Sequence, residues 1–295
     1  MIGEIKAMLI KRHLMLFFRD KANVFFSLLV VLIIIGLYIM FLGDIMEAAL
    51  SATLGFYSEG TGIAISSLML SGMIAVTSVT SCMGAIAISI ADKELALKDF
   101  LTSPIPRAKI TFSYIIGSSG VGLVMTFAAI STCLLYIVAR GGSLPSAGDF
   151  VLLAITSLLS VACANAMVYF LASFAESRNA FSAISSVIAT LIGFLMGVYI
   201  PMGQLPESVQ WIIRIFPMSH AASMYRKILA DGELYYLFTE AGAPPEVLQG
   251  FREFFGVSFN YGNFENSFWL SALWLATSTL IFFGLSMISS ARQKT

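Results

Sequence analysis

Six long runs of apolar residues, separated by polar segments, set the pattern of this sequence. A helix needs roughly 20 mostly apolar residues to cross the hydrocarbon core of a bilayer. Each run reaches about that length, so we expect an all-α integral membrane protein whose single transmembrane domain covers residues 1–295. The second and third runs exceed what a ~30 Å core requires, so they should tilt or protrude. The predicted spans cover residues 23–43, 62–90, 110–139, 150–174, 181–200 and 268–289.

The composition excludes a water-facing domain of this size. The 295 residues are 58% hydrophobic and only 12% charged, and the mean hydropathy is +0.88. A soluble domain carries about 25% charged residues, which are needed to cover its surface. The 17 basic and 17 acidic residues balance, so no excess of positive charge points to a nucleic acid partner, and the lipid bilayer is the expected surrounding.

Basic residues are distributed unevenly between alternate loops. Twelve of the 17 Lys and Arg residues lie in four segments: segment 1–22, loop 91–109, the loop after the fourth span and the C-terminal tail. Cytoplasmic loops of membrane proteins carry an excess of Lys and Arg. We therefore predict that both termini are cytoplasmic and that segment 201–267 is extracellular. The chain is then a multi-pass protein of the cell (plasma) membrane.

The segment before the first span is predicted to be an amphipathic helix. Within residues 1–22, Glu4, Lys11 and Arg19 fall roughly opposite an apolar face. Such a helix can lie on the cytoplasmic surface of the bilayer. A simple basic topology signal is the alternative interpretation. The apolar residues of the face are Ile2, Ile5, Leu9 and Leu16.

The cytoplasmic loop 91–109 contains a second amphipathic pattern. Leu97, Phe100 and Leu101 have the i, i+3, i+4 spacing that places side chains on one face of a helix. Pro104 disfavours helical backbone at the residue before it, and Pro106 prevents the helix from resuming at once. A short helix held between two long spans could pass motion from a cytoplasmic partner into the membrane. The alternative is a charged turn with a helical end.

Segment 201–267 contains two short, half-apolar helical patterns. Pro206 can begin the first helix, and Pro217 must interrupt it. Neither pattern is long enough to span, so we predict a re-entrant pair of helices on the outer side. A membrane-surface loop anchored by aromatic residues such as Trp211 is the alternative. The remaining residues 234–266 could form a small extracellular cap.

These features together resemble the permease subunit of type-2 ABC exporters. In loop 91–109, an acidic residue is followed by a Leu, by Thr102-Ser103-Pro104 and by a basic residue, as in that family. The second short pattern of segment 201–267 contains Pro-Met-Ser-His at 217–220, as in the family's re-entrant pair. One departure is that the middle of the loop reads Leu95-Ala96-Leu97-Lys98, where family members often have Gly-Thr. The re-entrant positions are Pro206, Trp211, Pro217 and His220.

The resemblance implies which residues contact an ATP-binding subunit. The loop corresponds to the family's coupling helix, which docks on that subunit. The chain contains no Walker A pattern, so we expect it to hold no cofactor and not to be an enzyme, with ATP and Mg bound by the partner. The implied contact residues are Glu94, Leu97, Phe100, Leu101, Thr102, Pro104 and Arg107.

The resemblance also implies an assembly and a substrate route. Two ATP-binding subunits would serve this chain and a second permease, which is either another copy or a sister permease. In the family, the second and fifth spans flank the pathway at the dimer axis. Tight packing without substrate contact is the alternative role for each residue there. The candidate pathway residues are Ser71, Thr77, Ser78, Ser185, Thr190, Gly193 and Gly197.

Few other chemistries fit this sequence. The two histidines are far apart in the sequence and the three cysteines lie in apolar runs, so no metal site is predicted. The spans lack the convergent acids and histidines of an intramembrane enzyme. The main hypothesis is therefore an ATP-driven exporter permease. The alternative is the membrane subunit of an ABC-type sensing, resistance or lipid-extraction complex.

Overall fold

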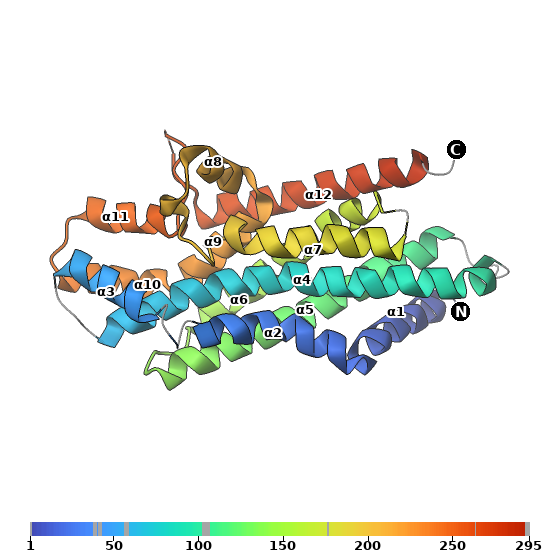
Figure 1. The fold of residues 1–295 in the computed structure, drawn as a ribbon, viewed down its shortest axis with the longest axis horizontal. Helices are drawn as coiled ribbons and strands as arrows, with labels where there is room; N and C mark the ends of the chain where they lie inside the picture. The colour runs from blue at the N-terminus through green and yellow to red at the C-terminus, as the bar shows by residue number, and fades with distance from the viewer. Residues whose placement is uncertain are drawn as a thin grey trace.

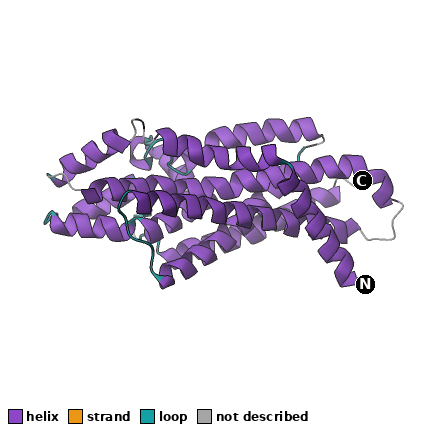
Figure 2. Ribbon diagram, turned by 90° about the horizontal axis from the view of Figure 1, so that it is seen from below, coloured by secondary structure: helices purple, strands orange, loops and turns teal. Residues whose placement is uncertain are grey.

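The chain folds into an elongated bundle in which long helices run side by side (Figure 1). The computed structural model describes residues 2–37, 40, 43–55, 59–101, 107–175, 177–262 and 264–292. In this part of the chain regular structure is helical (Figure 2), and the β contacts are limited to one isolated bridge between Asn260 and Glu265. The elements are α1 (Ile2–Arg19), α2 (Lys21–Leu37), α3 (Gly43–Leu54), α4 (Glu59–Leu101), α5 (Arg107–Ala139), α6 (Ala147–Ala172), α7 (Arg178–Leu195), the 3-10 turn η2 (Met202–Gln204), α8 (Glu207–Ile215), α9 (Pro217–Leu229), α10 (Asp231–Glu240), α11 (Pro245–Phe254) and α12 (Phe268–Arg292).

Five of these helices are long and apolar enough to cross a membrane, which confirms the all-α membrane class. They correspond to the second through sixth predicted spans, and lie in α4, α5, α6, α7 and α12. The first predicted span, 23–43, falls on α2, which has 17 residues, and partly on residues outside the described ranges. A sixth crossing there stays a prediction.

Helix α4 is the central element of the bundle. It has 43 residues and packs against α2, α5, α6, α7 and α9. Gly122 of α5 permits close approach, because a Cβ atom there would lie 2.9 Å from both Cys82 Sγ and a methyl group of Val161. Ser160 of α6 donates a hydrogen bond of 2.8 Å to Ser78 of α4. Small residues and hydroxyl pairs are the usual contacts between helices in a membrane.

The helix continues beyond the predicted span 62–90. It begins at Glu59 and extends to Leu101, so the segment predicted as a separate short helix is the end of α4. The stretch 91–101 contains Ala, Lys, Glu and Leu, which favour helix, and no Gly or Pro that would break it. The backbone between the bundle and Leu101 is therefore one uninterrupted helix.

The structure ends the predicted fifth span 181–200 early at its C-terminal end. Helix α7 ends at Leu195, because Gly197 has φ +61°, a left-handed conformation that ends helices. The amide of Val198 then donates back to the carbonyl of Gly193 at 2.9 Å. Residues 196–200 consequently leave the helix and turn towards η2.

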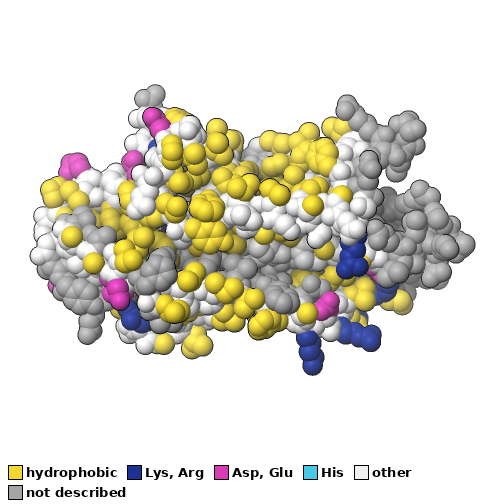
Figure 3. Space-filling view, in the orientation of Figure 1, with side chains coloured by type: hydrophobic (Ala, Val, Ile, Leu, Met, Phe, Trp, Pro, Cys, Tyr) yellow, Lys and Arg dark blue, Asp and Glu magenta, His cyan; other side chains and the backbone are white. Residues whose placement is uncertain are grey.

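The two ends of the bundle differ in composition and charge. We call the end with α1 and the last turns of α12 the terminal end, and the end with α3, α8, α10 and α11 the cap end (Figure 1). On the face drawn in Figure 3, apolar side chains cover the middle, Lys and Arg gather towards the terminal end, and most Asp and Glu lie at the cap end. This sorting matches the charge pattern of the sequence.

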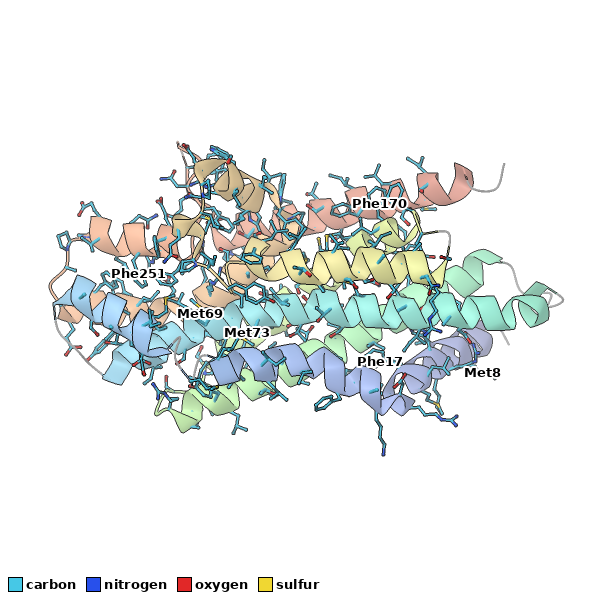
Figure 4. The ribbon with its side chains drawn as sticks, in the orientation of Figure 1. Met8, Phe17, Met69, Met73, Phe170 and Phe251 are labelled. Atoms are coloured by element: carbon cyan, nitrogen blue, oxygen red, sulfur yellow. The ribbon has the colours of Figure 1, made fainter. Side chains whose placement is uncertain are left out.

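The described residues of segment 234–266 form part of the cap end. Helices α10 and α11 pack with the start of α4 around a second apolar cluster that includes Leu68, Met69, Leu237 and Phe238. Met73, one turn further along α4, belongs instead to the main cluster of the bundle (Figure 4). Leu70, next to Met69, also belongs to the main cluster, so the two cores meet within one turn of α4.

Candidate functional site

Helices α1, α4 and α5 meet at the terminal end in a polar junction. The guanidinium of Arg12 donates two hydrogen bonds to the Asp92 carboxylate, of 2.7 and 2.6 Å. The Tyr114 hydroxyl donates a third bond of 2.5 Å to the same carboxylate. Asp92 thus joins one residue from α1 to one from α5. A bidentate pairing of arginine with carboxylate is among the stronger side-chain contacts and fixes orientation as well as distance.

His13 completes the junction on its buried side. Its side chain is 1% exposed, its Nε2 lies 3.5 Å from the Ser89 hydroxyl, and its ring meets that of Tyr114 edge-on. Gly117 of α5 makes room for it, because a Cβ atom there would lie 2.6 Å from His13 Cδ2. Burial lowers the pKa of His13 to about 4, so the ring is neutral at pH 7.

An apolar cluster supports the same junction. Phe17 is fully buried between α1 and the neighbouring helices, with Ala85 of α4 and Val121 and Met125 of α5 (Figure 4). The buried face of α1 therefore packs against the bundle, while Met8 and Met15 remain largely exposed. The helix is attached through the face that carries His13 and Phe17. Of the predicted apolar face, only Leu16 has a described side chain, and it is half-buried. Its position relative to the bilayer surface stays a prediction.

The predicted ATPase-contact residues lie beyond this junction, and their contacts stay predictions. Glu94, Leu97, Phe100 and Leu101 belong to the last turns of α4, although their side chains are outside the described part. Thr102 and Pro104 lie outside the described residues, and Arg107 is the first residue of α5. From Asp92 to Leu101 the helix rises about 14 Å, at 1.5 Å per residue.

The predicted pathway residues of α4 lie between packed helices. Ser71, Thr77 and Ser78 are each no more than 1% exposed. Ser71 and Thr77 donate to carbonyls one turn earlier in α4, and Ser78 donates to Ala75 and accepts from Ser160. Their hydroxyl groups are thus occupied within the single chain.

The predicted pathway residues of α7 are placed differently. Ser185 is half-buried, and Thr190 is exposed and donates to the Ser186 carbonyl at 2.9 Å. A Cβ atom on Gly193 would overlap the ring of Tyr199, so Gly193 serves the turn after α7. Gly197 lies in that turn rather than on the helix. These two glycines therefore shape the end of α7. The pathway assignment of both sets stays a prediction.

Helices α8 and α9 correspond to the two predicted short helices. Pro206 immediately precedes α8 and Pro217 is the first residue of α9, as their restricted backbones favour. Trp211 is 42% exposed and lies under the Arg214 guanidinium at 5.1 Å. The lengths of 9 and 13 residues exclude a crossing by either helix. Their re-entrant placement in the bilayer stays a prediction.

His220 of α9 is buried among polar partners at the cap end. Its Nε2 lies 2.9 Å from the Arg214 carbonyl and 3.2 Å from the Tyr261 hydroxyl, and its Nδ1 lies 3.2 Å from the Ser271 hydroxyl. Burial lowers its pKa to about 4. The residue joins α9 to α12. Among the described residues, no group of three His, Cys, Asp or Glu side chains could hold a metal.

Sequence reasoning did not identify Arg226, which holds the short helices to the bundle. The side chain is 2% exposed and donates to the carbonyls of Met196, Gly197, Leu68 and Gly256, at 2.7, 3.1, 3.3 and 3.4 Å. The described contacts of its guanidinium include no carboxylate. Burial lowers its pKa to about 10, so the side chain remains charged at pH 7.

Comparison with known protein families matches most of this chain. The family model described as ABC-2 type transporter matches residues 6–230, which is more than half of the chain. The match includes α1, the junction, the end of α4 and both short helices α8 and α9. A comparison with curated proteins found no match.

Proposed function

Because the chain belongs to the ABC-2 type transporter family, whose membrane domains are transport permeases that work with an ATP-binding partner, we propose that it is the permease subunit of an ATP-driven exporter. ATP hydrolysis then takes place in separate subunits, two of which dock at the terminal end. The observation that carries this proposal is the junction of Arg12, Asp92 and Tyr114, from which α4 continues unbroken to the predicted contact residues.

The junction supports a mechanism of coupling. A partner that pushes on residues 94–101 acts on the end of a helix whose other turns form the centre of the bundle. Asp92 ties that helix to α1 and α5, so the three helices would move together. ATP binding and substrate binding are then coupled if they favour different arrangements of the same helices.

The exposed face of α7 supports a dimer. In the single chain, 17% of the apolar stretch of α7 is buried, against 72% of that of α4. Ser182, Ser186 and Thr190 lie on this exposed surface, and the last two donate to carbonyls of their own helix. Lipid favours apolar side chains, whereas a second permease copy could cover this polar stripe and enclose a pathway along it.

The coupling proposal is tested by placing charge on the predicted contact. Phe100→Asp combined with Leu101→Asp should abolish stimulation of ATP hydrolysis and release the ATP-binding subunit, while the chain stays inserted in the membrane. The readouts are co-purification of the ATP-binding subunit and ATPase activity in reconstituted vesicles. Phe174→Asp is the matched control, because this exposed phenylalanine follows α6 outside the predicted contact.

Retained stimulation in the double variant would contradict the coupling assignment. Movement of a candidate substrate across vesicles, driven by ATP in wild type and lost in the double variant, would separate transport from sensing or lipid extraction. Stimulation without any movement would favour the alternative function.

A further inference from the structure

A cavity opens at the cap end, and no residue of α7 is among the described residues that line it. Its volume is about 530 Å³, within the range of sites that hold small organic molecules. Five parts of the chain line it: the start of α4, the end of α5, the loop before α6 with the first turn of α6, the end of α9 and the start of α10. Because these segments come from distant parts of the sequence, no linear motif marks the site.

The inner wall of the cavity is mostly apolar. Leu134 and Ile137 of α5 are buried, and Ile63, Ile228 and Leu229 are half-buried around it. Leu144 and Tyr236 line the same cavity and are each 63% exposed, which places them at its opening. A ligand with an apolar body could therefore enter from the surrounding solvent and contact aliphatic side chains inside.

Two carboxylates give the cavity a negative charge. Asp149 and Glu233 line it and are both half-buried, and the described lining contains no Lys or Arg. Two arginines of the cap end are paired elsewhere, Arg140 with Glu47 at 3.1 Å and Arg252 with Asp231 at 2.7 Å. The field in the cavity thus favours a cation, and partial burial strengthens it relative to water.

Ser67 is the observation that points to a ligand rather than to charge alone. This residue of α4 lines the cavity and is 1% exposed, yet its Oγ has no hydrogen-bond partner among the described residues. The hydroxyls of Ser66, Ser71 and Thr77 donate to carbonyls of their own helix. Those of Thr61 and Ser81 also lack a partner among the described residues, but neither residue lines the cavity. A buried hydroxyl without a partner is unfavourable, so a polar group supplied from the cavity would compensate it.

We propose that this cavity binds an organic amine: a protonated nitrogen held by Asp149 and Glu233, attached to an apolar body that lies against α5 and α9. A polar atom of the ligand reaches the Ser67 hydroxyl. The site is separate from the α7 stripe, so it does not depend on the coupling or dimer assignments. A soluble amine and a lipid with an amine headgroup share the required chemistry.

The test uses dansylcadaverine, a fluorescent primary amine with an apolar ring system, titrated into the purified chain in maltoside micelles. Glu233→Gln should weaken binding about tenfold, as expected for loss of one charged partner. The control is Glu240→Gln, the same change at the exposed end of the same helix and outside the cavity. Equal binding by both variants and wild type, or no saturable binding, would overturn the proposal.

Two further measurements sharpen the result. Ser67→Ala should weaken binding without lowering thermal stability, because the hydroxyl makes no bond in the empty cavity; unchanged affinity would remove Ser67 from the site. Glu233 carries the main test because the Asp149 carboxylate also caps α6 through Ser146. Competition by phosphatidylethanolamine but not by phosphatidylglycerol would identify a lipid as the occupant, and absence of competition would identify a soluble amine.

Discussion

Arg12 and Arg226 hold helices together near opposite ends of α4, and they do so by different chemistry. Arg12 pairs with a carboxylate and is 41% exposed, whereas Arg226 is buried and bonds only to carbonyl oxygens. Water can replace a partly exposed ion pair at little cost, but it cannot reach the Arg226 bonds. The ion pair at the terminal end therefore contributes less to stability than the buried Arg226 bonds, which attach α9 to α4 and to the end of α7.

Removing Arg226 should have the largest effect on the free energy of unfolding. Arg226→Met leaves the carbonyls of Met196, Gly197, Leu68 and Gly256 without their donor, and we expect a loss of about 3–5 kcal/mol in the free energy of unfolding, comparable to breaking a buried ion pair. Denaturant unfolding in detergent measures it. Arg252→Met removes a half-buried arginine of the cap end and should cost about 1 kcal/mol or less. Equal losses would contradict the distinction.

The attachment made by Arg226 could not be predicted from the sequence. In the linear pattern, Arg226 counts only as a basic residue of an outer loop, and its acceptors come from α4, the end of α7 and the turn after α11. Arg12 and Asp92 are 80 positions apart, so their pairing has no local signal either. Backbone carbonyls carry no residue-type signature, which makes such sites invisible before the fold is known.

Elements with a local cause were predicted well. The five long helices follow from apolar length, and the breaks at Pro206 and Pro217 follow from the restricted proline backbone. The end of α7 was placed at residue 200, because the apolar run continues there, but the left-handed Gly197 ends the helix earlier. Apolar length therefore located the helices, and the backbone conformation of single residues set these ends.

Acid should lower the free energy of unfolding, because one buried histidine lies at each end: His13 at the terminal end and His220 at the cap end. His13 and His220 each have a pKa of about 4 in the folded chain, below the ordinary 6.5. Between those values the unfolded state binds more protons, so stability is complete above pH 6.5, falls with decreasing pH and levels off below pH 4. The maximal loss is about 3 kcal/mol for each histidine.

Single substitutions separate the two contributions to this pH dependence. His13→Gln and His220→Gln should each reduce the slope of unfolding free energy against pH between 6.5 and 4 by about half. Chemical unfolding at a series of pH values measures the slope. Unchanged slopes in both variants would show that the two histidines bind protons equally in the folded and unfolded states, and would contradict the lowered pKa values.

Breaking the junction of α1, α4 and α5 should have only a small effect on stability. Arg12→Gln and Asp92→Asn should each lower the free energy of unfolding by about 1 kcal/mol, because one partner is substantially exposed. A double-mutant cycle isolates the pair. We expect the same variants to reduce stimulation of the ATP-binding subunit clearly, and full stimulation in both would remove the junction from the coupling mechanism.

The length of α4 has a consequence for how the two ends communicate. Its 43 residues extend about 64 Å, whereas a bilayer with its headgroups is about 40–45 Å thick. One helix therefore carries Ser67 in the wall of the cap-end cavity and Phe100 near its far end. Where a ligand at one end changes affinity at the other, thermodynamic reciprocity requires the same factor in both directions. An amine in the cavity and an ATP-binding subunit at the terminal end would then regulate each other through a single backbone.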